Sequence, residues 1–344
     1  MKTFTHIVFF AGLLFLNTTI QAQQIVHIPD PAFKQALLDH LPIIDTNGDG
    51  EIQVSEAEAV TELIVGDPWG SYNIQDLTGI EAFVNITFLD CQNNQLSSLN
   101  LNHNLLLEDL IFDDNNLTII DISENIKLKG ISCHNNNLTA IDLSQNPQLE
   151  GVYINNNYLT TIDLIQNSQL IGLDIGNNQF DFLDVSQNLF LRYLVCQNNN
   201  LTFLDVRNGN NENFTVFNAK DNPDLTCIFV DNAEYSETNW TDVDPASTFV
   251  ETQAQCDALG FNEMFLKEIN IFPNPAQNVL NIELPDLYFE ELYLAIKDVA
   301  GKTIAIHQLK TDFTLDVSQL PSGIYFLNIY NNQNKRLTKK LVKL

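Results

Sequence analysis

The stretches "ITFLDCQNNQL" (86–96), "LEDLIFDDNNL" (107–117) and "LEGVYINNNYL" (149–159) repeat one pattern of apolar residues and asparagine. The last apolar position of this pattern recurs every 21 residues, at Leu96, Leu117, Leu138, Leu159, Phe180 and Leu201. An asparagine stands two residues before each of them, namely Asn94, Asn115, Asn136, Asn157, Asn178 and Asn199. Six matches in one register indicate that the chain stacks copies of one short unit.

The pattern is that of a leucine-rich repeat. A coil of 21 residues can hold one strand and otherwise extended or turn-like chain, because no stretch here has a helical period. One coil cannot bury its apolar side chains alone, so the coils must share a continuous core. The sequence therefore predicts a mainly β fold, with a solenoid over residues 64–226 that begins with an irregular coil.

The repeated asparagines are expected to support this solenoid rather than to form a site. Their amide groups can hydrogen-bond the backbone where it turns. A second set repeats with the same period: Asn104, Asn125, Asn146, Asn167 and Asn188. Both sets are interpreted as structural ladders between neighbouring coils.

The charge and the N-terminus limit the location and the partners of the chain. A net charge of −28 argues against nucleic acid and anionic membranes as partners. Residues 1–22 are typical of a signal peptide, with Lys2, an apolar core and a polar end at Ala22. The apolar core is too short to anchor the chain in a membrane, and no other segment of spanning length follows. We expect export, with a mature chain that lacks a transmembrane segment.

Residues 25–63 are predicted to form a helical cap that contains a calcium loop. The segment 45–56 matches the D-x-[DN]-x-[DN]-G-x5-E motif, between a helix that starts at Asp30-Pro31 and a second helix from Ser55 to about Leu63. A hard divalent cation needs six to eight oxygen ligands, which such a loop supplies at fixed positions. The predicted ligands of a structural Ca²⁺ are Asp45, Asn47, Asp49, the Glu51 carbonyl, Gln53 and Glu56. The alternative is an acidic turn that binds no metal.

The five cysteines fall into two groups. Cys91, Cys133 and Cys196 share one inward strand position and are expected to be free core residues, because coils two steps apart lie about 10 Å from each other. Cys227 and Cys256 bracket a segment after the last coil. A solenoid needs a terminal cap over its exposed core, so residues 227–262 are predicted to form this cap, with a Cys227–Cys256 disulfide.

The outward face of the strands is the predicted ligand-binding face. It varies where the scaffold does not, and exposed Phe, Tyr and Val beside glycines suit a partner surface. The residues assigned to it are Phe88, Asp90, Asp109, Ile111, Ser132, His134, Tyr153, Asp174, Tyr193, Val195 and Asn218. Scattered exposed apolar side chains are also normal on protein surfaces, so this face can equally be without a ligand.

One further ladder and the search for catalytic motifs complete the site analysis. Asp121, Asp142, Asp163, Asp184 and Asp205 repeat with the coils and are interpreted as a solvated edge, with a file of bound cations as the alternative. The sequence contains no G-x-S-x-G, no H-E-x-x-H and no glycine-rich phosphate loop. Single histidines such as His40 are expected at the surface. The chain is predicted not to be an enzyme.

Residues 25–262 resemble the secreted leucine-rich repeat proteins of Bacteroidetes. The stretches "IDLSQNPQLEGVYINNNYL" (141–159) and "NPDLTCIFVDN" (222–232) carry this resemblance, and the helical cap is similar to that of internalins. The resemblance implies protein binding or adhesion. It does not identify a ligand, because the ligands of such proteins differ.

Residues 267–344 differ in composition from the rest of the chain. Nine Lys and Arg stand here against eight Asp and Glu, so nearly all of the negative charge lies before them. Alternating apolar residues and turn signals predict a small β-sandwich with strands at 269–272, 279–284, 292–297, 303–308, 314–317, 324–330 and 337–342.

Four sequence motifs of this tail also resemble those of a known family. "INIFPNPAQNVLNIEL" (269–284), "KDVAGK" (297–302), "LPSGIYFLNI" (320–329) and "KKLVKL" (339–344) resemble the type A C-terminal sorting domain of the type IX secretion system. This resemblance implies contact with that machinery and a secreted or outer-surface location. We thus expect an exported module that binds a protein or glycan, or alternatively a structural surface or matrix component without a dedicated ligand.

Overall fold

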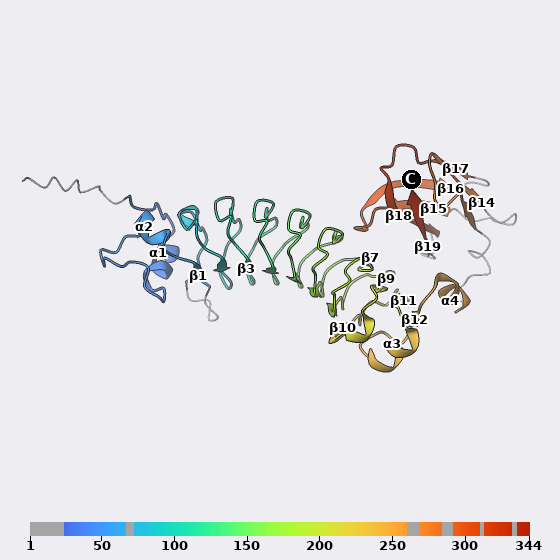
Figure 1. Ribbon diagram of the computed structural model, residues 1–344, viewed down its shortest axis with the longest axis horizontal. Helices are drawn as coiled ribbons and strands as arrows, with labels where there is room; N and C mark the ends of the chain where they lie inside the picture. The colour runs from blue at the N-terminus through green and yellow to red at the C-terminus, as the bar shows by residue number, and fades with distance from the viewer. Residues whose placement is uncertain (1–23, 67–71, 260–268, 284–291, 310–312, 332–335) are drawn as a thin grey trace, which may run out of the picture.

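The computed structural model describes residues 24–66, 72–259, 269–283, 292–309, 313–331 and 336–344 (Figure 1). The predicted signal peptide, 1–22, lies outside the described residues. In the described part, no helix has the length and the apolar character that crossing a membrane requires.

The N-terminal cap contains less helix than the sequence predicts. Helix α1 (Pro31–Leu38) is capped by Asp30, whose carboxylate accepts hydrogen bonds from the backbone N–H groups of Ala32 and Phe33. The second helix was predicted to reach Leu63, and this is wrong. Helix α2 (Val54–Ala57) is short. The residues after it form strand β1 (Glu62–Ile64), because they pair with the strand of the first regular coil.

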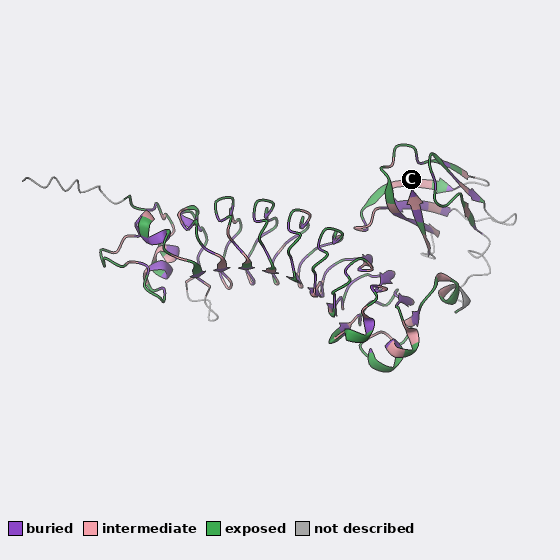
Figure 2. Cartoon of the chain, in the orientation of Figure 1, coloured by how far each residue is buried: buried purple, intermediate pink, exposed green. Residues whose placement is uncertain are grey.

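The coils form the predicted solenoid, and each contributes a short strand to one parallel sheet. After β1 these strands are β2 (Phe88–Asp90), β3 (Asp109–Ile111), β4 (Gly130–Ser132), β5 (Gly151–Tyr153), β6 (Gly172–Asp174), β8 (Tyr193–Val195) and β10 (Val216–Asn218). Equivalent residues of successive coils pair, as Val152 does with Leu173. The repeated leucines are buried along the inside of the stack (Figure 2).

The asparagine ladder holds the turn that follows each strand. The Asn136 amide nitrogen donates to the carbonyls of Phe112 and Cys133 at 3.0 and 3.2 Å, and its oxygen accepts from the Leu117 N–H at 3.0 Å. One ladder amide thus connects its own coil to the coil before it. The residue before each ladder asparagine has a positive φ of 51 to 56°, a conformation that Asn and Asp tolerate: Asn93, Asp114, Asn135, Asn156, Asn177 and Asn198.

A second parallel sheet, which the sequence analysis did not predict, lies on the other side of the last coils. Its strands are β7 (Phe182–Asp184), β9 (Phe203–Asp205), β11 (Cys227–Phe229) and β12 (Thr248–Val250), in the order β12-β11-β9-β7. Aromatic residues on neighbouring strands favour pairing because their rings can stack, as those of Phe182 and Phe203 do. Phe182 and Phe203 stand where earlier coils have Ile119, Ala140 and Thr161.

This second sheet changes the environment of the aspartate ladder. Asp121, Asp142 and Asp163 are exposed and accept hydrogen bonds from the backbone N–H two residues later. Asp205, in contrast, is only 4% exposed and pairs with Arg207. The interpretation as a solvated edge is therefore wrong at Asp205, because the second sheet buries that end of the ladder.

The C-terminal coils end in a cap with two helices, α3 (Ala233–Asn239) and α4 (Gln253–Ala258). The Trp240 ring stacks on Phe217 at 4.1 Å between centroids and covers the last coil. Cys227 and Cys256 form a disulfide with their Cα atoms 5.9 Å apart. Cys91, Cys133 and Cys196 are free and fully buried, and burial raises the pKa of each thiol.

The tail is an antiparallel β-sandwich, and its predicted strands are confirmed. One sheet has the order β13-β14-β17, from β13 (Asn270–Phe272), β14 (Val279–Glu283) and β17 (Phe313–Asp316). The other has the order β16-β15-β18-β19, from β15 (Leu292–Lys297), β16 (Thr303–Leu309), β18 (Gly323–Asn331) and β19 (Arg336–Lys343). Its core, around Leu280, Leu294 and Leu327, is separate from the solenoid core.

Candidate functional site

The residues assigned to the ligand-binding face lie on or directly beside the strands of the long sheet, and they differ in exposure. Asp109 and Tyr153 are exposed. Asp90 and Val195 are only 8% exposed. The remaining residues are half-buried: Phe88, Ile111, Ser132, His134, Asp174, Tyr193 and Asn218.

Two tyrosines in edge-to-face contact form an aromatic platform on this face. A Cβ at Gly151 would lie 3.0 Å from the Tyr153 ring, and one at Gly172 would lie 3.0 Å from its hydroxyl oxygen. The ring therefore lies over the two glycines, where a side chain would displace it. Tyr193 meets the Tyr153 ring edge-on, with centroids 6.2 Å apart. This platform, Tyr153 with Tyr193, is 39% exposed at Tyr153.

A hydrogen-bonded cluster of Asp113, Ser132 and His134 lies on the same face. The Ser132 hydroxyl donates to Asp113 at 2.7 Å, the His134 backbone N–H donates to the same carboxylate at 2.9 Å, and His134 Nδ1 lies 3.1 Å from it. Burial raises the pKa of Asp113, which is 4% exposed. The Ser132 hydroxyl lies closer to the Asp113 carboxylate than to His134 Nδ1, which is 3.4 Å away, so the carboxylate is its main hydrogen-bond partner.

The face is acidic. Burial raises the pKa of Asp174, and burial together with the charge of Glu108 raises the pKa of Asp109. Such shifts mean that ionisation of these carboxylates costs free energy, because burial removes water from the charged form. The residues predicted for this face include neither Lys nor Arg.

The segment 45–56 forms a tight loop held by its own hydrogen bonds. The Asp45 carboxylate accepts from the backbone N–H groups of Gly48 and Gly50 at 2.8 and 2.9 Å. Gly48 and Gly50 have positive φ values of 72 and 77°, as a sharp turn of this kind requires. Glu56 Oε1 accepts from the Thr46 N–H at 2.8 Å, so this carboxylate holds the start of the loop.

The donor chemistry of this loop fits a hard cation, since carboxylate, amide and carbonyl oxygens follow each other at the spacing that calcium needs. In the structure, however, these side chains hydrogen-bond to one another: the Asn47 amide donates to Asp49 and Gln53 at 3.0 and 2.9 Å. Within the described ranges, no three His, Cys, Asp or Glu side chains are gathered as a metal site. Calcium at this loop remains a proposal.

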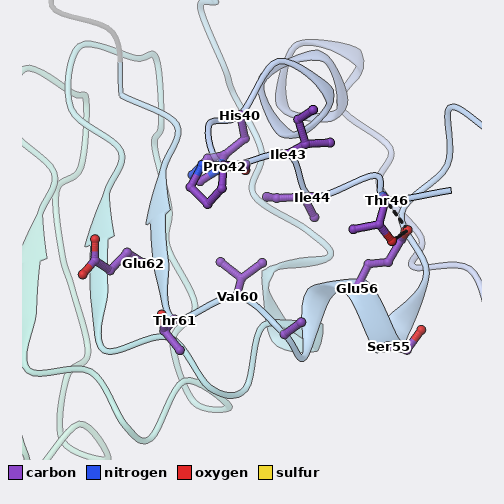
Figure 3. Close-up of a pocket in the computed structure, with 11 residues that line it drawn as sticks. His40, Pro42, Ile43, Ile44, Thr46, Ser55, Glu56, Val60, Thr61 and Glu62 are labelled. Atoms are coloured by element: carbon purple, nitrogen blue, oxygen red, sulfur yellow. Dashed lines mark hydrogen bonds between the residues drawn. The ribbon is translucent and has the colours of Figure 1, made fainter. Parts of the chain in front are cut away.

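A hollow of about 320 Å³ lies between this loop and β1, and Figure 3 shows residues that line it. His40, at its edge, is 6% exposed, so the expected surface position is wrong for this histidine. The Ile64 N–H donates to His40 Nε2 at 3.1 Å, and Nδ1 lies 2.9 Å from the Pro42 carbonyl oxygen. His40 therefore connects the cap to the first strand of the solenoid, which gives it a structural role.

Asp113 is the main residue of the strand face that the sequence analysis missed. A signal existed, because Asp113 stands 21 residues before His134, which was assigned to the face. The burial of the carboxylate and its bond to Ser132 depend on the contact between neighbouring coils, and this contact is not visible in a single repeat.

The fold and this face define the chain as a leucine-rich repeat solenoid that carries a separate C-terminal β domain. Residues 270–344 match the family model described as "Secretion system C-terminal sorting domain". This domain indicates secretion by the type IX system, to the cell surface or to the outside. No curated protein matches the chain.

Three solved structures are similar to parts of this chain. A leucine-rich repeat protein of Leptospira interrogans is 19% identical, with a TM-score of 0.40, over 58% of this chain and 51% of its own. Internalin C2 of Listeria monocytogenes is 17% identical, with a TM-score of 0.38, over 67% and 98%. A Bacteroides vulgatus protein with an immunoglobulin-like β-sandwich is 18% identical, with a TM-score of 0.20, over 22% and 84%. The chain thus spans about half the length of the Leptospira protein.

Proposed function

We propose that this exported chain binds a protein partner that presents Lys or Arg side chains to the strand face. The observation that carries the proposal is the Tyr153–Tyr193 platform, bordered by carboxylates whose pKa burial raises, notably Asp174. A cationic side chain gains from the face of a tyrosine ring and from a partly desolvated carboxylate. The role is recognition rather than catalysis.

Two alternatives make different predictions for the same face. An exposed tyrosine ring can also stack on a sugar, so a glycan partner would depend on Tyr153 but only weakly on the carboxylates. A structural surface component without a ligand would depend on neither. The glycines beside Tyr153 favour a ligand over a spacer, because a spacer does not need room for an aromatic ring close to the sheet.

The test uses the mature chain on arrays of basic, acidic and neutral peptides and of neutral glycans. We expect capture of basic peptides, weakened about tenfold by Tyr153→Ala and by Asp174→Asn. Tyr158→Ala is the matched control, because Tyr158 is 52% exposed in the same coil but outside the strands. Binding should weaken with salt, and also as the pH falls, starting at a higher pH than ordinary carboxylates would give, because the pKa of Asp174 is raised.

Binding of basic peptides that Tyr153→Ala and Asp174→Asn leave intact would refute this assignment. Capture of glycans alone would replace the proposed partner. Absence of any capture would favour the structural role.

We further propose that the loop 45–56 holds Ca²⁺ with a structural role. Its oxygen donors and glycine turn support this proposal, and the ligands would be those that the motif predicts. A bound ion would fix the loop between α1 and α2, and so the cap on the first coil.

A further inference from the structure

The second sheet presents a row of phenylalanines that points away from the solenoid core. Leu183, Leu204 and Ile228 of β7, β9 and β11 belong to that core. Their neighbours Phe182, Phe203 and Phe229 form a separate cluster, which is called the aromatic strip here. The Phe182 and Phe203 rings stack at 4.8 Å, and those of Phe203 and Phe229 lie 5.4 Å apart.

The aromatic strip is buried, although the same position is exposed in an earlier coil. Phe182 is 3% exposed, whereas Ile119, at the equivalent coil position, is 70% exposed. Coil packing alone therefore does not bury this position. At one end of the strip, the Arg207 guanidinium lies over the Phe229 ring, 4.8 Å from its centroid, so it is Phe182 and Phe203 that something outside the solenoid covers.

The cover is the C-terminal domain of the same chain. Phe326 of β18 lies 4.6 Å from the Phe182 ring and 5.5 Å from the Phe203 ring, and it is 2% exposed. Its neighbours Tyr325 and Leu327 point into the sandwich core. Phe326 thus stands on the outer face of its sheet, which in an isolated sandwich would face water.

The approach between the two parts is close at a second point. A Cβ at Gly301 would lie 3.1 Å from the Phe182 ring. Gly301 also has a φ of 82°, which favours glycine. The turn between β15 and β16 can therefore lie directly on the aromatic strip.

Charges at the edge of this contact are complementary. Lys297, paired with Phe326 across β15 and β18, places its Nζ 2.5 Å from Asp181 Oδ2. The Lys297 side chain is only 8% exposed. Lys340, paired with Phe326 on the other side, lines a small hollow together with Asp163 and Asp184 of the solenoid. An apolar centre with a charged rim is the usual construction of a specific interface.

We propose that the aromatic strip is a second interaction surface of the solenoid, occupied by the chain's own C-terminal domain, which acts as an internal cover. The strip then cannot engage anything else until the domain has moved away or has been removed. This inference rests on the contact alone and is independent of the proposed ligand of the strand face.

The test compares full-length variants by small-angle X-ray scattering and by binding of a hydrophobic dye. We expect Phe326→Ser to raise the radius of gyration and the dye signal, because the cover opens and exposes the strip. Tyr330→Ser is the matched control: Tyr330 lies on the same strand and face but stacks on Tyr293 within the tail. Phe182→Ser is compared with Ile119→Ser, its exposed equivalent.

A charge exchange separates opening from unfolding. Lys297→Asp should open the contact, and the addition of Asp181→Lys should close it again, which a misfolded tail would not do. Thermal unfolding followed by circular dichroism checks that each variant folds. The proposal is overturned if the wild-type chain already scatters as an open molecule, or if folded Phe326→Ser and Lys297→Asp chains remain as compact as the wild type.

Discussion

At the scale of the residue, two asparagine ladders that look alike in the sequence differ in their hydrogen bonds. The first ladder uses both ends of its amide, as Asn136 does. In the second, the Asn146 nitrogen donates to the Ile122 and Asn125 carbonyls at 3.1 and 3.0 Å, but its buried oxygen has no partner. The two ladders should therefore contribute unequally to stability.

This difference predicts unequal costs of substitution. Asn136→Ala removes the donors to buried carbonyls and leaves the Leu117 N–H unpaired, so it should cost on the order of 1–3 kcal/mol of unfolding free energy. Asn146→Ala leaves only carbonyl groups without a hydrogen-bond donor, so it should lower the unfolding free energy by less. Urea unfolding measures both, with the exposed Asn116→Ala as control. Equal costs for the two ladder variants would contradict this account.

At the scale of the element, the loop 45–56 links the cap helices without a large core of its own. Ile52 is fully buried, but most of the loop between Asp45 and Gly50 is half-buried or exposed. An ion at this loop would replace some of the internal hydrogen bonds by coordination of the same oxygens to a divalent cation.

The calcium proposal predicts that titration of the chain with Ca²⁺ gives a heat of binding and that bound Ca²⁺ stabilises the cap against unfolding. We expect the mature chain to take up one Ca²⁺ with an affinity of about 10⁻⁴–10⁻³ M, as in extracellular modules. Glu56→Gln should weaken this uptake, whereas Glu58→Gln, a neighbouring exposed acid, should not. Calorimetry measures the uptake, and the melting temperature with and without calcium reports the cap. No uptake by the folded mature chain would remove the site.

At the scale of the whole molecule, the chain combines an acidic solenoid with a nearly neutral tail. Nearly all of the negative charge lies in the solenoid part, while the tail provides the sorting signal. The contact through Phe326 and Lys297 joins the two parts, so the tail covers a surface as well as directing export.

The sorting domain predicts the fate of a truncated chain. A chain that ends at Phe265 should fail to reach the medium or the cell surface and should accumulate inside the cell, because the matched segment is missing. Fractionation of the producing cells measures this, with the tagged full-length chain as control. Normal export of the truncated chain would contradict the role of the tail.

The sequence by itself determined the repeated features of the fold. The leucines and asparagines in a 21-residue register dictated the stacked coils, since only stacking buries them, and alternation in the tail dictated its strands. Tertiary structure alone decided what depends on neighbours. The second sheet, the burial of Asp113 and His40, and the cover over Phe182 arise where distant segments meet. A local sequence pattern predicts which side chains are buried, but it does not predict which distant segment buries them.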